Sequence, residues 1–489
     1  MSHPDIAIRS PHLEGAEVSW FAPLCNGDDE FLGHHDLRYK SDWSNTSNVL
    51  LTADRLGYRN ILCPSSYQVG QDTLTFASAV APLTSQINLL AAIRCGEVPP
   101  PMLGRAIATL DHLLKGRLTI NIISSDLPGT KLESAARYQR SREVIEILKQ
   151  GWTQDYIDYR GEFYNIQLAT TDPVRPYQQN GGPLLYFGGY SPAAVDLCAE
   201  HCDVYLMWPE TETRIQELMQ NMSDKAADYG RKVDFGLRMH VIVRETETEA
   251  RAAAHQLMKY IDQDADKGVE IRERALDAKS YGVARQAEMR KLATDDGFAE
   301  PNLWTGIGRA RSGCGGAIVG DPDQVLAKIH RYLDMGIRAF IFSGYPHASE
   351  CKLFANYVLP KLKTFSMPEV QGRKPQAAPP TPLAAGIRPY PKTTRTPMLD
   401  LGIVIVYFVS IFLVAIAGRV KEDATVEEYF LSSRNLRWPS IALSSIATNI
   451  NGYQFLGMMG SAYLYGLAQD SLEINAVQSI LMAAYIFVP

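Results

Sequence analysis

Short apolar segments alternate with stretches of helical periodicity over most of the chain, and this alternation restricts the fold more than any other feature. Repeated strand-then-helix order predicts a parallel sheet. Eight such units predict an α/β protein with a closed (β/α)8 TIM barrel. The alternative is an open doubly wound sheet, but no GxGxxG motif follows a predicted strand. The expected strands are residues 18–23, 60–64, 87–93, 118–123, 184–187, 204–207, 235–246 and 339–342.

The longest gap between predicted strands, residues 249–319, separates the seventh strand from the eighth. Its first part is rich in charge (DQDADKGVEIRERALDAK), and its last part is rich in glycine (GIGRARSGCGG). We predict a helical insertion lid between strands 7 and 8, with Arg309 and Arg311 in a flexible basic loop that closes over the barrel mouth. The alternative is a solvated helical elaboration.

The seventh predicted strand, FGLRMHVIVRET (235–246), places two functional side chains on one face. Apolar residues occupy every second position, while Arg238 and His240 share the opposite face two residues apart. A guanidinium group is a permanent anion ligand, and an imidazole can transfer a proton. A strand whose polar face is simply wet remains the alternative.

Composition excludes some function classes. A net charge of -6 gives no case for nucleic-acid binding. The seven cysteines are scattered, which predicts reduced thiols, and no Cys/His set near Cys198 and Cys202 completes a metal site. Residues 1–16 lack the apolar region of a secretory signal and are expected to be a mobile leader.

Several residues are candidates for cofactor or substrate contacts once a barrel is assumed. In YFGGYS (186–191), Gly189, Tyr190 and Ser191 end a strand and open a helix, an arrangement that can bind a phosphate group. An ordinary capped helix is the alternative. The further candidates are Asn121 and Tyr138 for cofactor contacts, or else as satisfied core polar groups, Tyr345 at the barrel rim, and His347, which could equally lie on the surface.

Long ungapped motifs between residues 17 and 368 resemble the bacterial-luciferase-like flavin monooxygenases, and within them the alkanesulfonate monooxygenases. The motifs are LGYRNILCP (56–64), ATLDHLLKGR (108–117), LLYFGGYS (184–191), VYLMWPE (204–210), FGLRMHVIVRET (235–246), PNLWTGIGRARSG (301–313) and SGYPH (343–347).

The resemblance implies an FMNH2-dependent monooxygenase that converts a small alkanesulfonate to an aldehyde and sulfite. It implies reduced FMN from a separate NAD(P)H-dependent flavin reductase, O2 as co-substrate, and a flavin C4a-peroxide. Matched onto this sequence, Arg238 and Arg311 would bind the sulfonate. His240 would transfer a proton or stabilise the peroxide, and Tyr345 would line the same pocket.

Two departures from the family pattern concern residues that contact flavin and substrate. Cys25 stands where the family has a histidine, and residues 65–72 lack the family's cysteine, with Cys63 several positions early. Another sulfonate, a sulfone, a different small carbon substrate, or a flavin-binding barrel without turnover are therefore alternatives.

The C-terminal part has a different composition. Residues 368–397 are proline-rich and predict a semi-rigid linker, whereas three long apolar runs follow it. The runs predict an all-α transmembrane segment with membrane contact. The predicted organisation is a barrel at residues 1–367, a linker at 368–397 and a transmembrane segment at 398–489.

This segment resembles the start of a sodium/solute symporter through EYFLSSR (428–434) and ATNINGYQFLGMMGSAY (447–463). The resemblance implies that Ala447 and Ile450 offer carbonyls to sodium in an incomplete site. Because the chain stops in the third run, we do not expect transport. We expect either a fused, truncated reading frame or a membrane-associated enzyme with the barrel on the cytoplasmic side, in which the barrel could serve a symporter. Self-association into a homo-oligomer is left open.

Overall fold

The computed structural model describes a barrel and its elaborations. The chain divides into two units, Met1–Pro389 and Tyr390–Pro489, and nearly all described residues belong to the first. No helix in that described part combines the length and apolar character needed to cross a bilayer. The described residues are 6–25, 28–169, 175–273, 275, 279–377, 409 and 413.

The C-terminal predictions concern residues that lie almost wholly outside the described part of the chain. The predicted linker is described only to residue 377. The predicted transmembrane segment lies outside the described residues apart from Val409 and Leu413, and so do the predicted sodium ligands Ala447 and Ile450.

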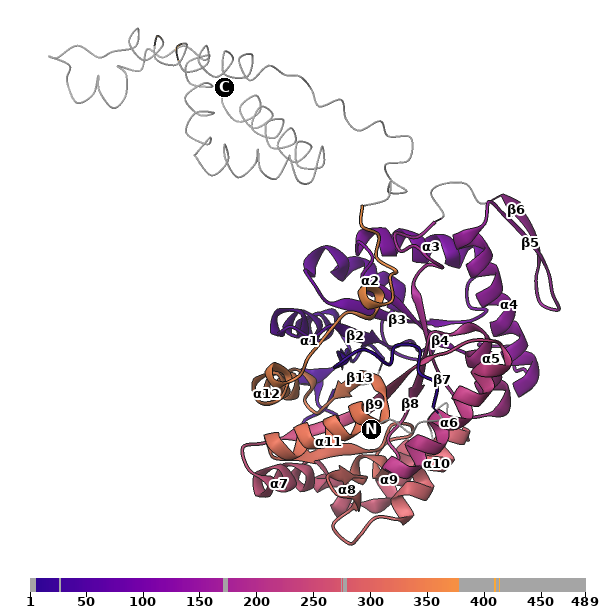
Figure 1. The fold of residues 1–489 in the computed structure, drawn as a ribbon. Coiled ribbons are helices and arrows are strands. Elements are labelled where there is room, and N and C mark those ends of the chain that lie inside the picture. Colours follow the sequence, from indigo (N-terminus) through magenta and orange to yellow (C-terminus); the bar gives the residue numbers. More distant parts are fainter. Residues whose placement is uncertain are drawn as a thin grey trace, which may run out of the picture. The chain divides into compact units, whose positions relative to one another are not determined.

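Eight parallel strands close into the predicted barrel (Figure 1). Within the ring, each strand is hydrogen-bonded to two others, and the ring closes where the first strand pairs with the last. The strands correspond to the eight apolar segments, with ends that differ by a few residues at most. They are β1 (Glu17–Phe21), β2 (Asn60–Cys63), β3 (Asn88–Arg94), β4 (Leu118–Ile123), β7 (Leu184–Gly188), β8 (Val204–Met207), β9 (Asp234–Val243) and β13 (Ile337–Ser343).

Helices surround the barrel, and local sequence signals set their ends. Before the last barrel strand, Asp321 caps a helix and exchanges hydrogen bonds with Gln324 in a capping box, while Gly336 ends the helix at φ 108°. The α-helices are α1 (Trp43–Leu56), α2 (Thr73–Val80), α3 (Pro100–Leu113), α4 (Ser134–Thr153), α5 (Pro192–His201), α6 (Glu212–Asp228), α7 (Glu247–Leu257), α8 (Lys259–Gln263), α9 (Ala265–Glu273), α10 (Tyr281–Lys291), α11 (Pro322–Met335), α12 (His347–Tyr357) and α13 (Met367–Val370).

Short elements complete the described part of the chain. A two-stranded hairpin follows α4, and three short strands lie in the insertion between β9 and β13. These elements are β5 (Tyr156–Arg160), β6 (Asn165–Ala169), β10 (Phe298–Glu300), β11 (Leu303–Trp304) and β12 (Ala317–Gly320), with 3-10 turns at η1 (Leu37–Tyr39), η2 (Ala81–Leu83), η3 (Gly306–Arg309) and η4 (Leu359–Lys361).

The insertion is joined to the barrel wall more closely than a simple lid would be. Its strand β12 runs parallel to the second half of β9, so that Ala317 pairs with His240 and Gly320 with Val243. Helix α7 packs against β12, and helices α7 to α10 lie along the same side of the barrel (Figure 1). The sequence predicted the insertion but not this strand, which is only four residues long.

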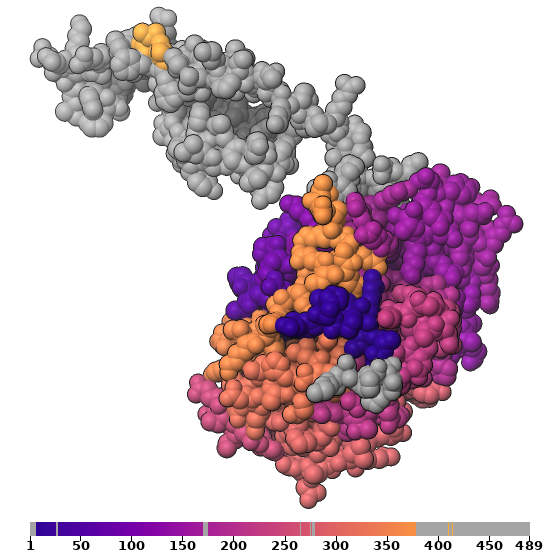
Figure 2. Space-filling view, in the orientation of Figure 1, coloured from indigo at the N-terminus to yellow at the C-terminus, as the bar shows by residue number. Residues whose placement is uncertain are grey.

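The expectation of a mobile N-terminal leader is wrong for residues 6–16. Ile8 is buried and pairs with Val233, and the Arg9 guanidinium contacts the Asp203 carboxylate at 2.5 Å. The indigo N-terminal segment lies on the surface between later parts of the chain (Figure 2). Buried apolar side chains and a half-buried ion pair hold it there, because release of the segment would expose that apolar area to water.

Candidate active site

The carboxyl ends of β1, β9 and β13 bring the candidate residues to one end of the barrel. Arg238 and His240 lie on β9, and Tyr345 and His347 follow β13 directly. Arg311 reaches this end from the loop between η3 and β12. Active sites of TIM-barrel enzymes lie at this end because parallel strands deliver their following loops there.

His240 is a buried histidine with both ring nitrogens engaged. Nε2 lies 3.2 Å from the Cys314 carbonyl oxygen, and Nδ1 lies 2.9 Å from Ser343 Oγ. Since a carbonyl can only accept, Nε2 carries the proton and Nδ1 accepts from the hydroxyl. Burial lowers the pKa of His240 well below its ordinary value, and the guanidinium groups of Arg238 and Arg311 lower it further. The imidazole is therefore neutral at physiological pH.

Tyr345 connects the insertion to the barrel strands. Its ring stacks on the His240 ring at a centroid distance of 5.4 Å, and the Arg311 guanidinium carbon lies 5.5 Å from its centroid. The Tyr345 hydroxyl and His347 Nε2 are both buried and have no hydrogen-bond partner within the described residues. Buried polar atoms are normally paired, so these two atoms indicate where a ligand would supply partners.

A buried carboxylate positions His347. Asp28 accepts from the backbone amide of His347 at 3.0 Å, and its Oδ1 lies 2.7 Å from His347 Nδ1. Both side chains are almost fully buried, so His347 is not the surface residue that the sequence left open. The carboxylate fixes the orientation of the His347 ring, which meets the Tyr345 ring edge-on at a centroid distance of 5.0 Å.

Arg238 packs against an aromatic ring beside these residues. Its guanidinium carbon lies 4.5 Å from the Phe21 centroid, and its backbone carbonyl accepts from Cys314 Sγ at 3.3 Å. A ring face stabilises a guanidinium group while leaving its N–H donors at the edge able to bind an anion.

A cavity of about 340 Å³ opens next to Arg311 and Tyr345. Burial raises the pKa of the Cys25 thiol at its wall to about 11, so the thiol is protonated at neutral pH. The wall combines cationic, acidic, imidazole and apolar groups: Cys25, Asp29, Leu32, Gly33, His34, His35, Ile271, Ala310, Arg311 and Tyr345.

The residues predicted to hold flavin lie on other strands. Ser191 caps α5 and accepts from the Ala194 amide at 3.3 Å. A Cβ on Gly189 would lie 2.7 Å from the Ala194 Cβ, so glycine is required at this close approach. The Tyr190 hydroxyl accepts from the Trp208 amide at 2.6 Å.

Asn121 and Tyr138 lie near this helix start. Asn121 is on β4 and pairs in register with Tyr186 of β7, while the Tyr138 ring meets Phe187 edge-on at 6.3 Å. Strand β8 separates β7 from β9. The structure thus brings the predicted substrate residues together near β9 and β13. The predicted flavin residues form a second group near β4 and β7.

The family follows from the sequence model that matches residues 17–339, that of the luciferase-like monooxygenases. The chain belongs to the luciferase-like monooxygenase family. A second match, to the sodium:solute symporter family, covers residues 429–489. Both predicted resemblances are confirmed, and the enzyme is a flavin-dependent monooxygenase.

Relatives of this luciferase-like monooxygenase include two sulfoquinovose monooxygenases. That of Agrobacterium fabrum is 55% identical over 383 residues, which are 78% of this chain and 99% of that protein. That of Novosphingobium aromaticivorans is 51% identical over 357 residues, 71% of this chain and 97% of that protein. The solved oxygenating constituent of 3,6-diketocamphane monooxygenase from Pseudomonas putida shares the fold, with a TM-score of 0.52, 17% identity, and coverage of 72% of this chain and 100% of that chain.

Sequence reasoning missed two residues of this monooxygenase site. Asp28 lies in the acidic run GDDE just after β1, and its place behind a strand end was an available signal. Ser343 is the last residue of β13 and lies inside the SGYPH motif, but only the fold shows that it faces His240.

Proposed function

We propose that this enzyme oxygenates the sulfonate-bearing carbon of a sugar sulfonate such as sulfoquinovose, and releases sulfite and an aldehyde. The observation that carries the proposal is the meeting of Arg311, Tyr345 and His240 beside a cavity with acidic and imidazole groups. The sulfoquinovose monooxygenases among the relatives support this substrate. The simple alkanesulfonate expected from the sequence is the alternative substrate.

The sulfonate would bind to Arg311 and Arg238. A sulfonate is a weakly basic anion with three oxygens, and fixed guanidinium groups can donate to two of them at once. The Tyr345 hydroxyl and His347 Nε2 are the unpaired buried atoms of the same region, so both would contact the substrate. A ligand that satisfies both atoms would also remove the cost of leaving them unpaired.

The sugar hydroxyls would bind at the other side of the cavity. Asp29, His34 and His35 line the same cavity as Arg311, and His35 Nδ1 lies 3.7 Å from Asp29 Oδ1. Carboxylate and imidazole groups accept hydrogen bonds from hydroxyls. An unsubstituted alkyl chain would leave these groups without such partners, which favours a polyhydroxylated substrate.

FMN would be held by Gly189, Tyr190 and Ser191 at the start of α5, with Asn121 and Tyr138 beside it. The amides of a helix start suit a phosphate, and the close approach at Gly189 fits a loop that must leave room for one. Reduced FMN, which we expect from a separate reductase, would supply the two electrons that convert O2 into one inserted oxygen atom and one water.

The protein's own part is to orient the substrate and control protons. Oxygen insertion at the sulfonate carbon is followed by C–S cleavage, sulfite leaves, and the carbon becomes an aldehyde. Neutral His240 holds the Ser343 hydroxyl through Nδ1 and supports the Tyr345 ring through stacking. The Tyr345 hydroxyl, which is buried and without a partner in the described part of the chain, would donate a proton to the bound substrate.

Sulfite release tests this proposal directly. The full-length chain should be supplied with a flavin reductase, NAD(P)H, FMN and O2, and offered sulfoquinovose or short alkanesulfonates. We expect sulfite and an aldehyde in equal amounts, with a higher kcat/KM for sulfoquinovose. If no sulfonate gave sulfite, the proposal would be overturned. A higher kcat/KM for alkanesulfonates than for sulfoquinovose would overturn the proposed substrate.

We further propose that residues 398–489 attach the enzyme to a membrane, with the barrel on the cytoplasmic side where a reductase can reach it. The symporter match at residues 429–489 supports this. Full-length enzyme should sediment with membranes and resist an alkaline carbonate wash. Recovery in the soluble fraction would contradict the proposal.

A further inference from the structure

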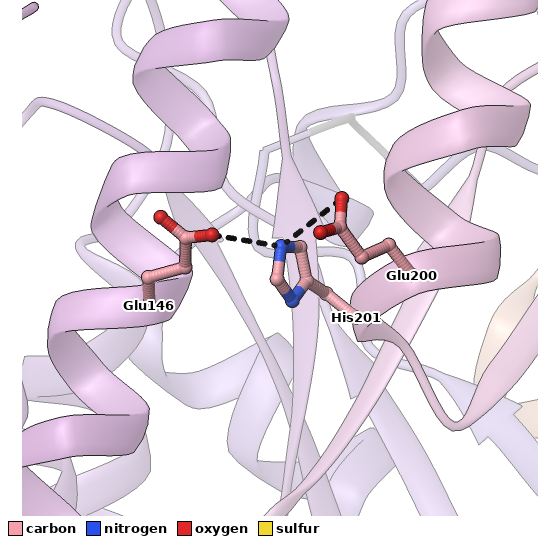
Figure 3. A group of neighbouring side chains, drawn as sticks. All are labelled: Glu146, Glu200 and His201. Atoms are coloured by element: carbon pink, nitrogen blue, oxygen red, sulfur yellow. Dashed lines mark ion pairs between the residues drawn. The ribbon is translucent and has the colours of Figure 1, made fainter. Parts of the chain in front are cut away.

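Two glutamates and a histidine from neighbouring helices converge outside the candidate active site (Figure 3). Glu146 comes from α4, while Glu200 and His201 are the last two residues of α5. Helix α5 begins at the rim after β7 and ends just before β8, so this cluster lies at the opposite end of the barrel from the cavity.

The distances from the His201 side chain to the two glutamates are longer than those of hydrogen bonds. His201 Nε2 lies 3.5 Å from Glu146 Oε1 and 3.5 Å from Glu200 Oε2. His201 is 8% exposed, and its Nε2 has no hydrogen-bond partner within the described residues. A buried nitrogen that lies at ion-pair distance from two carboxylate oxygens but hydrogen-bonds to neither indicates a missing partner between them.

We propose that Glu146, Glu200 and His201 form a binding site for a divalent zinc-class cation, with water as the fourth ligand. Zinc ligands lie roughly 2.0–2.2 Å from the metal, so adjacent ligands of a tetrahedral site lie about 3.4 Å apart. The two nitrogen–oxygen separations match this spacing. One imidazole and two carboxylates are a donor set that zinc accepts.

Neighbouring groups hold two of the ligands in place. The Tyr159 hydroxyl donates to Glu146 Oε2 at 2.5 Å, which leaves Oε1 turned toward His201. The Lys149 ammonium donates to the His201 backbone carbonyl at 2.8 Å, which anchors the end of α5. Metal ligands are commonly fixed by such outer partners.

Three cationic side chains surround the cluster and set its affinity. Lys149 and Arg231 both donate to backbone carbonyls at the end of α5, and Arg142 contacts Glu200 Oε2. Arg142 competes directly with a metal for that oxygen. Its second guanidinium nitrogen already lies 2.8 Å from Asp196 Oδ2, so it keeps a partner when displaced.

Metal titration of the full-length chain tests the site. After chelator treatment, ZnCl2 should raise the Tm, and one Co2+ per chain should give the intense visible absorption of a tetrahedral site. Loss of an outer partner costs about 10–100-fold in metal affinity, so loss of the ligand in His201→Gln should cost more than about 100-fold. Arg142→Gln should bind Zn2+ more tightly than the wild type.

Matched variants make the result decisive. His255→Gln makes the same chemical change on an exposed face of α7 and should leave the Zn2+ response unchanged. Should His201→Gln fail to fold, Glu200→Gln, whose side chain is 26% exposed, replaces it and should also abolish the response. No Zn2+ response in the wild type, or a full response in His201→Gln and Glu200→Gln, would overturn the proposal.

Discussion

Two buried histidines, His240 and His201, have similar electrostatics and opposite surroundings. Burial is the largest cause that lowers the pKa of both, to about 3 for His201, and nearby cationic side chains lower both further. His240 faces a hydroxyl, a carbonyl and an aromatic ring beside a cavity, whereas His201 faces two carboxylates on the outer helices. A shifted pKa therefore does not locate the active site; position at the strand ends does.

The largest effect should come from Arg311→Ala. Truncating one partner of a buried charge pair costs about 2–5 kcal/mol, so kcat/KM for sulfite release should fall about 10³-fold. Arg309→Ala is the matched control two residues away, at the end of η3, where Arg309 pairs with Asp262 at 2.7 Å. Equal losses in both variants would show that the loop, and not the Arg311 charge, carries the effect.

His240→Asn should lower kcat about 10²-fold, because proton control in the site would lose its imidazole. His255→Asn, on an exposed helix face, should stay within about twofold. Steady-state sulfite release measures both variants. If His201→Asn lowered kcat as strongly as His240→Asn, the assignment of His240 alone to the active site would be wrong.

Asp29→Asn should raise the KM for sulfoquinovose about tenfold, since a hydrogen bond to a charged group contributes about 1.5 kcal/mol. The KM for a short alkanesulfonate should change little. Comparing both substrates in one variant sharpens the distinction between the sulfonate end and the hydroxyl end of the cavity. An equal change for both would place Asp29 outside sugar recognition.

The smallest effect concerns acid stability. His240 has a folded-state pKa far below its unfolded value of about 6.5, so the unfolded chain binds more protons below that pH. Stability should therefore decrease as the pH falls below about 6.5, by at most about 1.4 kcal/mol per pH unit from this residue. His240→Asn should flatten that part of a urea-unfolding profile, and an unchanged slope would contradict the prediction.

Local sequence patterns predicted the barrel strands and the side chains that these strands carry, because interactions between residues close in sequence determine both. The barrel strands are buried on both faces and read as apolar runs, and β9 revealed Arg238 and His240 because its polar residues break that rule. Glu146 and His201 could not be linked, since they lie in separate helices whose packing the fold decides. Strand β12 was missed because a four-residue strand in a glycine-rich region has no clear period.

The pairing of β12 with β9 restricts how the Arg311 loop can move. The His240 amide donates to the Gly316 carbonyl at 3.0 Å, so the loop is tethered at the residue whose ring it covers. The Gly315 carbonyl also accepts from the Gly308 amide at 3.0 Å, so the segment from Arg311 to Gly315 reaches at most about 14 Å when fully extended. Any displacement of this loop would therefore pull on the backbone of His240, so the position of Arg311 and the position of the imidazole would change together.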